Sequence, residues 1–455
     1  MTALNAWLGE HAVALDSLDP DDLDPSSPDL AAITRLVGDA RVVFVGESMH
    51  RIHEFLDVRH RIVRHLVTEL GFTAFAMESG FAEARLVDDW IGGRSDLRPR
   101  EVLERGLTYH MGKCQELLDQ LAWMRRHNLA AARPLRFHGI DLSASAASAR
   151  PAVEVVAEIL DRIDPGYSAV VRETLLPRFD HLPPEGGLAW AALAIRAYLE
   201  LGEPERFELT ARIGALAERT AALAPRFAGT DDAEAIAFAA QAAATARRTD
   251  AFLAAMVGAA GRGFPPANVR DLAMAENIRW ILRREPRIVV AAANGHVQRS
   301  SFVSPPLVPE PQLTFGQHLA DELRGHSVVI ASTYGGGDAW LHRPSPDDAP
   351  GESTPFVEAV EKPRPRTLDA AIAAGVRTSG TSGTPGSPGA MPPGFLVDLR
   401  DAPAGGPVRD AADQLEGTAH GPYVLSSAPF DAFDSAVHVD RITPWHTWLD
   451  AHGRS

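Results

Sequence analysis

The sequence predicts an α/β protein with a mostly parallel central sheet flanked by helices and a large helical insertion or subdomain. Early in the chain, short apolar runs rich in β-branched residues alternate with helical segments, as in a parallel sheet. A long block that reads as helix nearly throughout follows, and further apolar runs come after it. The chain has 455 residues, 45% of them hydrophobic, which is enough to bury a large core.

Five apolar runs are predicted as strands. The first, VVFV at 42–45, is continuously apolar, which indicates a strand covered on both faces. A helix is expected at about 52–70, between the first two strands, and Asp29 is expected to cap a short helix before them. The other four runs are FTAFAM at 72–77, LRFHGID at 135–141, RIVVAAA at 287–293 and SVVIAST at 327–333.

The domain organisation follows from this alternation. The helical block between the third and fourth runs is predicted to be an insertion that forms a wall opposite the strand ends. FLVDLRDA and VHVDRITPWHTWLDA are expected to add an edge strand and a terminal segment. The predicted divisions are 1–150 and 286–375 for the two parts of the α/β core, 151–285 for the helical subdomain, 376–394 for a flexible Gly/Ser/Pro-rich loop and 395–455 for a C-terminal segment.

The composition excludes several classes of partner and site. The formal net charge is -16 and the pI is near 5.5, so nucleic acid and anionic membranes are repelled on average. The N-terminus lacks the pattern of a signal peptide, and no run of about 18 apolar residues occurs, so we expect a cytoplasmic protein. A single cysteine, Cys114, rules out an internal disulfide and a cysteine-based metal cluster.

Polar residues follow four of the predicted strands. Ligands of an open parallel sheet bind beyond the carboxyl ends of its strands, where the loops diverge. Any one of these acids can simply cap the helix that follows it, but all four sets at one edge favour a site. The residues are Glu47 and His50 after the first strand, Glu78 after the second, Asp141 after the third, and Asn294 and His296 after the fourth.

The helix after the first strand carries a cation on its apolar face. Arg59 interrupts the apolar stripe between Leu56 and Ile62. A buried guanidinium needs a partner, and Glu47 and Glu78 are the nearest acids in this arrangement. A structural ion pair is the alternative role for Arg59. Together, the histidines, carboxylates and arginine suit the activation of water without a covalent nucleophile.

Motifs of other common enzymes are absent from the sequence. The GESMH stretch around Ser48 lacks the second glycine of a G-x-S-x-G elbow, and no phosphate-binding or dinucleotide-binding glycine motif occurs. His53 and the residues after it do not form H-E-x-x-H. His53, His60 and His65 are therefore interpreted as surface or packing residues of their helix.

With these residues in place, the chain resembles the erythromycin esterase family, within a wider group of Tiki/ChaN-like α/β proteins. The resemblance extends over about residues 29–335 and is carried by GESMHRIHEF, VRHRIVRHLVTELGFTAFAMESGFAEA, VRDLAMAENIRWI and NGHVQ. It implies a carboxylic ester hydrolase that opens the lactone of macrolide antibiotics, and thus a link to antibiotic resistance.

The resemblance also implies roles for individual residues. Glu47 and His50 match the G-E-x-x-H motif, with His50 as the general base that activates water. Glu78 matches the second glutamate of the family, Arg59 the helix arginine, and His296 the last histidine of an H-N-x-H segment. These five residues are the catalytic set that the resemblance implies.

Two positions depart from the family pattern. Ala293 stands where the first histidine of the H-N-x-H segment is expected, so the site has one fewer imidazole. Arg51 follows His50 where many relatives have glycine. In RDLAMAENIRW, Arg270, Glu276 and Asn277 either support the cleft or tie two helices together.

Three functions remain open on the sequence alone. The first is a hydrolase of a small-molecule ester or lactone that uses no cofactor and has His50 as its base. The second places a divalent metal on Glu47, His50, Glu78 and His296, since two carboxylates and two imidazoles form a reasonable set of ligands. The third is a non-enzymatic module that binds a ligand or cofactor, which the replacement at Ala293 keeps open.

Overall fold

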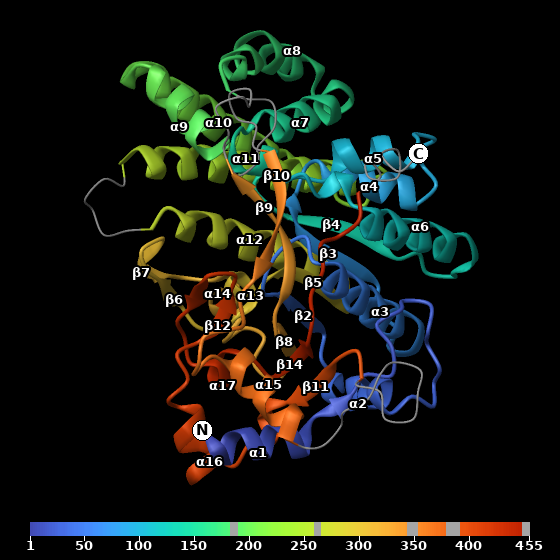
Figure 1. The fold of residues 1–455 in the computed structure, drawn as a ribbon. Helices are drawn as coiled ribbons and strands as arrows, with labels where there is room; N and C mark the ends of the chain where they lie inside the picture. Colours follow the sequence, from blue (N-terminus) through green and yellow to red (C-terminus); the bar gives the residue numbers. More distant parts are fainter. Residues whose placement is uncertain (183–189, 259–264, 344–353, 379–391, 448–455) are drawn as a thin grey trace, which may run out of the picture.

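A central sheet of eight strands organises the molecule (Figure 1). The computed structural model describes residues 1–182, 190–258, 265–343, 354–378 and 392–447. The strand order is β1-β11-β14-β8-β2-β5-β3-β4, which confirms the predicted α/β class. The strands are β1 (Val13–Ala14), β2 (Val42–Glu47), β3 (Ala74–Gly80), β4 (Arg136–Asp141), β5 (Ile288–Ala293), β8 (Ser327–Tyr334), β11 (Phe395–Asp398) and β14 (Ser435–Val439).

Six of these strands are parallel. β14, β8, β2, β5, β3 and β4 pair parallel to one another, whereas β11 pairs antiparallel with both β14 and β1 at one side of the sheet. The five strands predicted from apolar runs are all present. The first C-terminal run forms a strand as predicted, but β11 is not at the edge because β1 covers it, and the second run forms the internal strand β14 instead of only a terminal segment. All five residues of β14 are buried, so it belongs inside the sheet, while the two-residue β1 is too short to leave a periodic signal.

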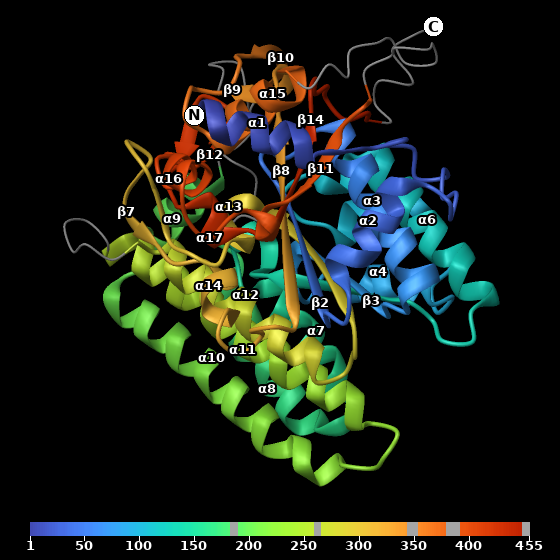
Figure 2. The ribbon, with the colours of Figure 1, turned by 90° about the horizontal axis from the view of Figure 1, so that it is seen from below.

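The strands contribute alternate side chains to two hydrophobic cores. In β5, Val289 and Ala291 face one core, while Ile288 and Val290 face the other. This explains the continuous apolar runs, because a parallel strand covered on both faces has no polar side. Helices lie on both sides of the sheet in Figure 2.

The face of the sheet to which Val289 and Ala291 contribute is covered by helices from the N-terminal part of the chain. Asp29 does not cap α2, whose N-cap residue is Ser27; its buried carboxylate instead accepts a 2.5 Å hydrogen bond from Arg61 of α3. This correction arises because a cap and a first-turn ion-pair partner look alike in sequence. The helices are α2 (Pro28–Val37), α3 (His53–Leu70), α4 (Ala84–Ile91), α5 (Pro99–Gly106) and α6 (Gln115–Ala130).

The long helical block is present where the sequence predicted it. Figure 1 shows most of its helices stacked above the sheet, and α12 lies closest to the strands. The amide of Asn277 in α12 donates a 2.8 Å hydrogen bond to the carbonyl of Ile140 in β4. The helices are α7 (Arg150–Ile163), α8 (Pro165–Thr174), α9 (Trp190–Glu200), α10 (Glu203–Leu223), α11 (Ala233–Gly258) and α12 (Ala267–Leu282).

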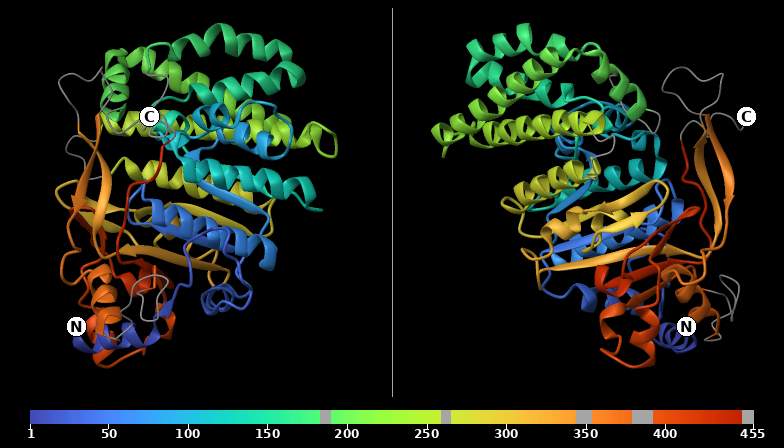
Figure 3. Two further views of the ribbon diagram at one scale, coloured as in Figure 1. Left: turned by 45° about the vertical axis from the view of Figure 1, so that its right-hand side comes forward. Right: turned by 90° about the vertical axis from the view of Figure 1, so that its left-hand side faces the viewer.

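The remaining elements surround the C-terminal side of the sheet. Figure 3 shows the β9–β10 hairpin rising from the sheet toward the level of the helical block. The remaining helices are α1 (Thr2–His11), α13 (Asn294–Val297), α14 (Phe315–Leu319), α15 (Leu368–Thr378), α16 (Pro407–Ala412) and α17 (Pro429–Ala432). The three hairpins are β6 (Phe302–Ser304) with β7 (Val308–Gln312), β9 (Gly337–Arg343) with β10 (Thr354–Val360), and β12 (Thr418–His420) with β13 (Tyr423–Leu425).

Two sequence expectations concern the surface of the molecule. The predicted flexible loop begins inside α15, and residues 379–391 lie outside the described residues. In the part of the chain that the structure describes, no helix has the length and apolar character needed to cross a membrane.

Candidate active site

The polar residues predicted at the strand ends lie together. Glu47 ends β2, Glu78 lies near the end of β3, Asp141 ends β4, and His296 lies in α13 directly after β5. Arg270 and Asp271 of α12 join them from the face of the sheet to which Ile288 and Val290 contribute. We call this group the strand-end cluster: Glu47, His50, Glu78, Asp141, Arg270, Asp271 and His296.

His50 is held by a carboxylate and faces a second one. Its Nδ1 lies 2.6 Å from Oε1 of Glu47, and its Nε2 lies 3.9 Å from Oε1 of Glu78. Because a carboxylate accepts, Nδ1 carries a proton, and Nε2 of the neutral ring is left with a lone pair. Burial lowers the pKa of His50, but the charges of Glu78 and Glu47 outweigh burial and leave the pKa above its ordinary value.

The glycine of the GESMH stretch is required by close packing. A Cβ atom on Gly46 would lie 2.2 Å from Oδ1 of Asn294. Asn294 cannot move aside easily, because its amide nitrogen donates to the carbonyl of Ser332 at 2.8 Å and its Oδ1 accepts from the Ser332 backbone at 3.2 Å. Asn294 therefore fixes the end of β2, and with it the position of Glu47, rather than lining up with the titratable groups.

Glu78 is the centre of the electrostatic network. Its Oε1 accepts a 2.7 Å hydrogen bond from Arg270, and its Oε2 accepts a 2.9 Å bond from the backbone nitrogen of Ala293. Arg270 also binds Asp141 through a 2.6 Å contact. Burial raises the pKa of Glu78, but the positive charges of His296, His50 and Arg270 lower it well below its usual range. Glu78 is thus ionised while it is 5% exposed.

His296 is oriented from the opposite side. Its Nδ1 lies 2.8 Å from Oδ1 of Asp271, a fully buried carboxylate that also accepts from the backbone of Phe315. Its Nε2 lies 3.5 Å from Oε1 of Glu78 and 3.3 Å from Nη1 of Arg270. Burial lowers the pKa of His296, whereas Asp271 and Glu78 raise it by more, so the net pKa is raised.

Arg59 reaches only one of its two expected partners. Its Nη1 lies 3.8 Å from Oε2 of Glu47, and its guanidinium lies 5.6 Å from the ring centre of Phe75. The predicted contact with Glu78 was wrong, because Arg270 approaches Glu78 from the other face of the sheet. Nε and Nη2 of Arg59 have no hydrogen-bond partner within the described residues, and burial lowers the pKa of this guanidinium.

Three site residues were missed or left undecided by sequence reasoning. Arg270 was undecided; it supports the site, while Glu276 binds Arg248 and so ties α12 to α11. Asp271 was missed, although its place beside Arg270 at the start of a helix is a signal. His420 was also missed, because it lies in a weakly patterned stretch; its Nδ1 donates to the carbonyl of Ser48 at 2.5 Å.

His420 approaches the strand-end cluster from the β12–β13 hairpin. Since Nδ1 faces a carbonyl oxygen, it carries the proton, and Nε2 of the neutral ring keeps its lone pair. Burial lowers the pKa of His420, and the positive charge of His50 lowers it further. His420 is therefore a neutral imidazole beside two imidazoles, His50 and His296, whose pKa values are raised.

Arg51 and the C-terminal segment hold the loop after His50. Arg51 has a φ angle of 66°, in the left-handed region that favours glycine. Its carbonyl accepts a 3.0 Å hydrogen bond from the backbone of Trp445, and its guanidinium donates to the carbonyl of Tyr109 at 3.3 Å. These contacts offset the cost of the left-handed backbone.

The other histidines of α3 behave differently from one another. His60 is buried against Trp123, and His65 bonds to Thr34 at 2.8 Å, as expected for packing residues. His53 instead contacts a carboxylate of a neighbouring helix: its Nδ1 lies 2.8 Å from Oε1 of Glu116 in α6.

Comparison with known proteins shows to which family this chain belongs. The sequence model of the erythromycin esterase family matches residues 67–442. The chain belongs to the erythromycin esterase family. Glu78, Arg270 and His296 lie inside the matched range, while Glu47 and His50 precede it.

The erythromycin esterase family includes curated relatives of moderate similarity. Erythromycin esterase type II of Escherichia coli is 28% identical over 307 residues, covering 65% of this chain and 69% of that protein. Erythromycin esterase type I of Escherichia coli is 26% identical over 339 residues, covering 70% of this chain and 77% of that protein. Two of the relatives are thus esterases by name, which places this chain among hydrolases at the level of the family.

Solved structures share the fold of this erythromycin esterase family member. A histidine-to-asparagine mutant of the erythromycin esterase EreC, in its open conformation, is 23% identical with a TM-score of 0.73, covering 94% of this chain and 97% of that one. A Bacillus cereus protein is 20% identical, also with a TM-score of 0.73, covering 98% of each chain.

Proposed function

We propose that this protein is a carboxylic ester hydrolase that opens a lactone or ester of the macrolide type. The observation that supports this most strongly is the 2.6 Å contact between Glu47 and Nδ1 of His50, which leaves Nε2 facing Glu78 across 3.9 Å. A separation of this size between two polar atoms suits a bridging water. The names of the curated relatives support the substrate class.

In the proposed reaction, His50 acts as a general base. Water held between Nε2 of His50 and Glu78 attacks the carbonyl carbon of the ester, and its proton passes to Nε2. The tetrahedral intermediate then collapses: the bond from carbon to the alkoxy oxygen breaks, and the proton on Nε2 passes to the departing oxygen. The products are a carboxylic acid, which loses its proton to solvent, and an alcohol, so a lactone opens and gains the mass of one water.

The carboxylates keep the base in its working state. Glu47 accepts from Nδ1 and so holds Nε2 toward the water, and it stabilises the imidazolium that forms when the proton is taken up. Glu78 stays ionised because Arg270 binds it at 2.7 Å. In this scheme, the ionised Glu78 accepts a hydrogen bond from the second O–H of the water and so fixes the orientation of the water.

His296 is the proposed electrophilic group. Asp271 holds Nδ1 so that Nε2 points into the cluster, where Arg270 lies 3.3 Å from it, and Asp271 and Glu78 raise the pKa of His296. An N–H donor at this position, from Arg270 or from His296 when it takes up a proton, stabilises the negative charge that develops on the substrate oxygen. This assigns the second imidazole a role without the histidine that Ala293 replaces.

A metal-dependent form of the same reaction is the alternative that the experiment must separate. Among the described residues, the strand-end cluster does not bring three ligand atoms within 4.8 Å of one another. Arg270 contacts both Glu78 and His296, and its positive charge disfavours a divalent cation between them. We therefore propose that His50 activates the water without a metal ion.

The test is hydrolysis of a panel of macrolides, simple lactones and esters, followed by mass spectrometry. The panel is run with the wild-type protein and with a sample treated with a strong chelator. We expect a product heavier by one water from at least one macrolide, at the same rate in both samples. No product from any member of the panel would contradict the proposed function. Loss of product with the chelator, at a temperature where the stripped protein stays folded, would contradict the metal-independent mechanism.

A further inference from the structure

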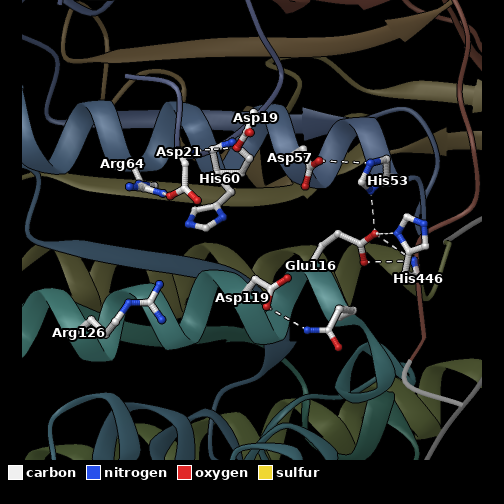
Figure 4. Close-up of a pocket in the computed structure, with 12 residues that line it drawn as sticks. Asp19, Asp21, His53, Asp57, His60, Arg64, Glu116, Asp119, Arg126 and His446 are labelled. Carbon is white, nitrogen blue, oxygen red and sulfur yellow. Dashed lines mark hydrogen bonds and ion pairs between the residues drawn. The ribbon is translucent and has the colours of Figure 1, made fainter. Parts of the chain in front are cut away.

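A second group of imidazoles and a carboxylate lies outside the strand-end cluster. We call His53, Glu116 and His446 the rim cluster. Nδ1 of His53 and Nδ1 of His446 each lie 2.8 Å from the same oxygen, Oε1 of Glu116. The three side chains each offer a ligand atom for a metal ion, and among the described residues these atoms lie within 4.8 Å of one another. Figure 4 shows both rings turned toward the carboxylate.

We propose that the rim cluster binds a divalent transition metal, with Zn²⁺ as its best match. Two imidazole nitrogens and one carboxylate are a ligand set that Zn²⁺ accepts, with a fourth position left for water. The two N–H groups that now face Oε1 give up their protons when the metal binds, as metal binding to imidazole requires. The three groups already converge, so the ligands need only separate slightly around the ion.

Groups around the rim cluster are placed to orient its ligands. Nε2 of His53 lies 3.3 Å from Oδ2 of Asp57, so a carboxylate lies behind the ring while Nδ1 faces the metal position. The second oxygen of Glu116 accepts from the thiol of Cys114 at 3.2 Å and from the backbone of His446 at 3.2 Å. Partners of this kind fix the ring orientation and raise ligand basicity in metal sites.

The pocket beside the rim cluster gives a cation access. Its volume is about 520 Å³, and Figure 4 shows the residues that line it. Five carboxylates outnumber two guanidinium groups in its lining, so the local charge attracts a divalent cation. The side chain of His446 is 65% exposed, which leaves an open path from solvent. The charged lining residues are Asp19, Asp21, Asp57, Glu116 and Asp119 against Arg64 and Arg126.

The position of the rim cluster gives the metal a structural effect. His53 begins α3 three residues after His50, and His446 lies in the C-terminal segment that runs beside this loop. Trp445, next to His446, donates to the carbonyl of Arg51 at 3.0 Å. A metal that joins His53 to His446 therefore fastens the C-terminal segment to the loop that carries His50.

Zn²⁺ binding to the full-length protein tests this proposal. The protein is stripped with a chelator, the chelator is removed, and Zn²⁺ uptake is measured by calorimetry and by the rise in Tm. We expect one Zn²⁺ per chain and a higher Tm for the wild type. We expect His446→Ala to weaken binding at least about tenfold and to lose the rise in Tm, and Asp57→Asn to weaken it about 10- to 100-fold.

Two matched variants distinguish binding at the rim cluster from binding at the strand-end cluster. His50→Ala removes a ligand that the strand-end cluster would need, and we expect it to bind Zn²⁺ as the wild type does. His446→Cys supplies a thiolate in place of the imidazole, and we expect it to retain binding. The metal-free Tm of His446→Ala is measured beside that of the wild type, so that loss of the 2.8 Å contact with Glu116 is separated from loss of metal binding. No Zn²⁺ uptake by the wild type, or unchanged affinity in His446→Ala, would overturn the proposal.

Discussion

The strand-end cluster and the rim cluster use the same chemical groups in different surroundings. His50 and His53 are three residues apart, and each lies within 2.8 Å of a glutamate. In the strand-end cluster, the carboxylates are buried and an arginine binds two of them. In the rim cluster, one imidazole is 65% exposed and no arginine contacts the glutamate among the described residues. The two pairs therefore differ in their burial and in the charged groups around them.

Electrostatics follow from this contrast in surroundings. Arg270 binds both Glu78 and Asp141, so a guanidinium fixes the geometry of these two buried carboxylates in the strand-end cluster. Glu116 is stabilised instead by hydrogen bonds: burial raises its pKa, but bonds from His53 and from the backbone of His446 lower it to about 2. A buried cluster whose carboxylates are held by an arginine suits catalysis, whereas an open cluster without an arginine suits the binding of a cation.

The strongest effect is expected on catalysis by the strand-end cluster. His50→Ala should lower kcat about 10²- to 10⁴-fold, because the reaction loses its general base. Steady-state rates on the best ester of the panel measure this. The matched control is His326→Ala, an exposed histidine in neither cluster, which should leave kcat unchanged. His53→Ala should lower kcat less than about tenfold, and an equal loss in His50→Ala and His53→Ala would erase the distinction between the clusters.

The next effect concerns the stability of the buried charges around Arg270. Arg270→Gln should lower the free energy of unfolding by about 3 to 5 kcal/mol, because Glu78 and Asp141 would be buried without their common partner. Urea denaturation measures the change. Arg248→Gln is the matched control: Arg248 binds Glu276 at the partly exposed surface, so its loss should cost about 0 to 1 kcal/mol. A loss below about 3 kcal/mol for Arg270→Gln would mean that Glu78 and Asp141 do not depend on Arg270 as their common partner.

A smaller effect is expected from the partner of His296. Its pKa is raised in the folded protein, so the imidazolium stabilises the fold below the ordinary pKa, and this contribution is lost as pH rises through the folded value. Asp271→Asn should therefore destabilise the protein more at low pH, by an added amount on the order of 1 kcal/mol. Unfolding curves at several pH values measure this, and a difference independent of pH would contradict the assigned charge.

The sequence was most informative where local pattern decides the structure. The strands of the sheet are buried on both faces, so they appear as continuous apolar runs, and Glu47, Glu78 and His296 follow from the rule for strand ends. The convergence of Glu78 and His296 was therefore predictable before any geometry was known.

The rest depends on packing that a local pattern does not encode. Whether Arg270 or Arg59 reaches Glu78 depends on how α12 and α3 cross the two faces of the sheet. His420 joins the site through a hairpin that follows Glu47 by more than 370 residues in the chain, as its contact with Ser48 illustrates. The position of β14 inside the sheet depends on pairing with β8, which its short apolar run does not reveal.

The pH profile of kcat/KM is the decisive test of whether His50, held by Glu47, activates water. As the base must be neutral, activity should rise with pH through the pKa of His50, with a midpoint above about 6.5 because that pKa is raised. In Glu47→Gln, the lost negative charge should move this midpoint to lower pH by about one pH unit. An unchanged midpoint in Glu47→Gln would contradict the proposed role of the Glu47–His50 pair.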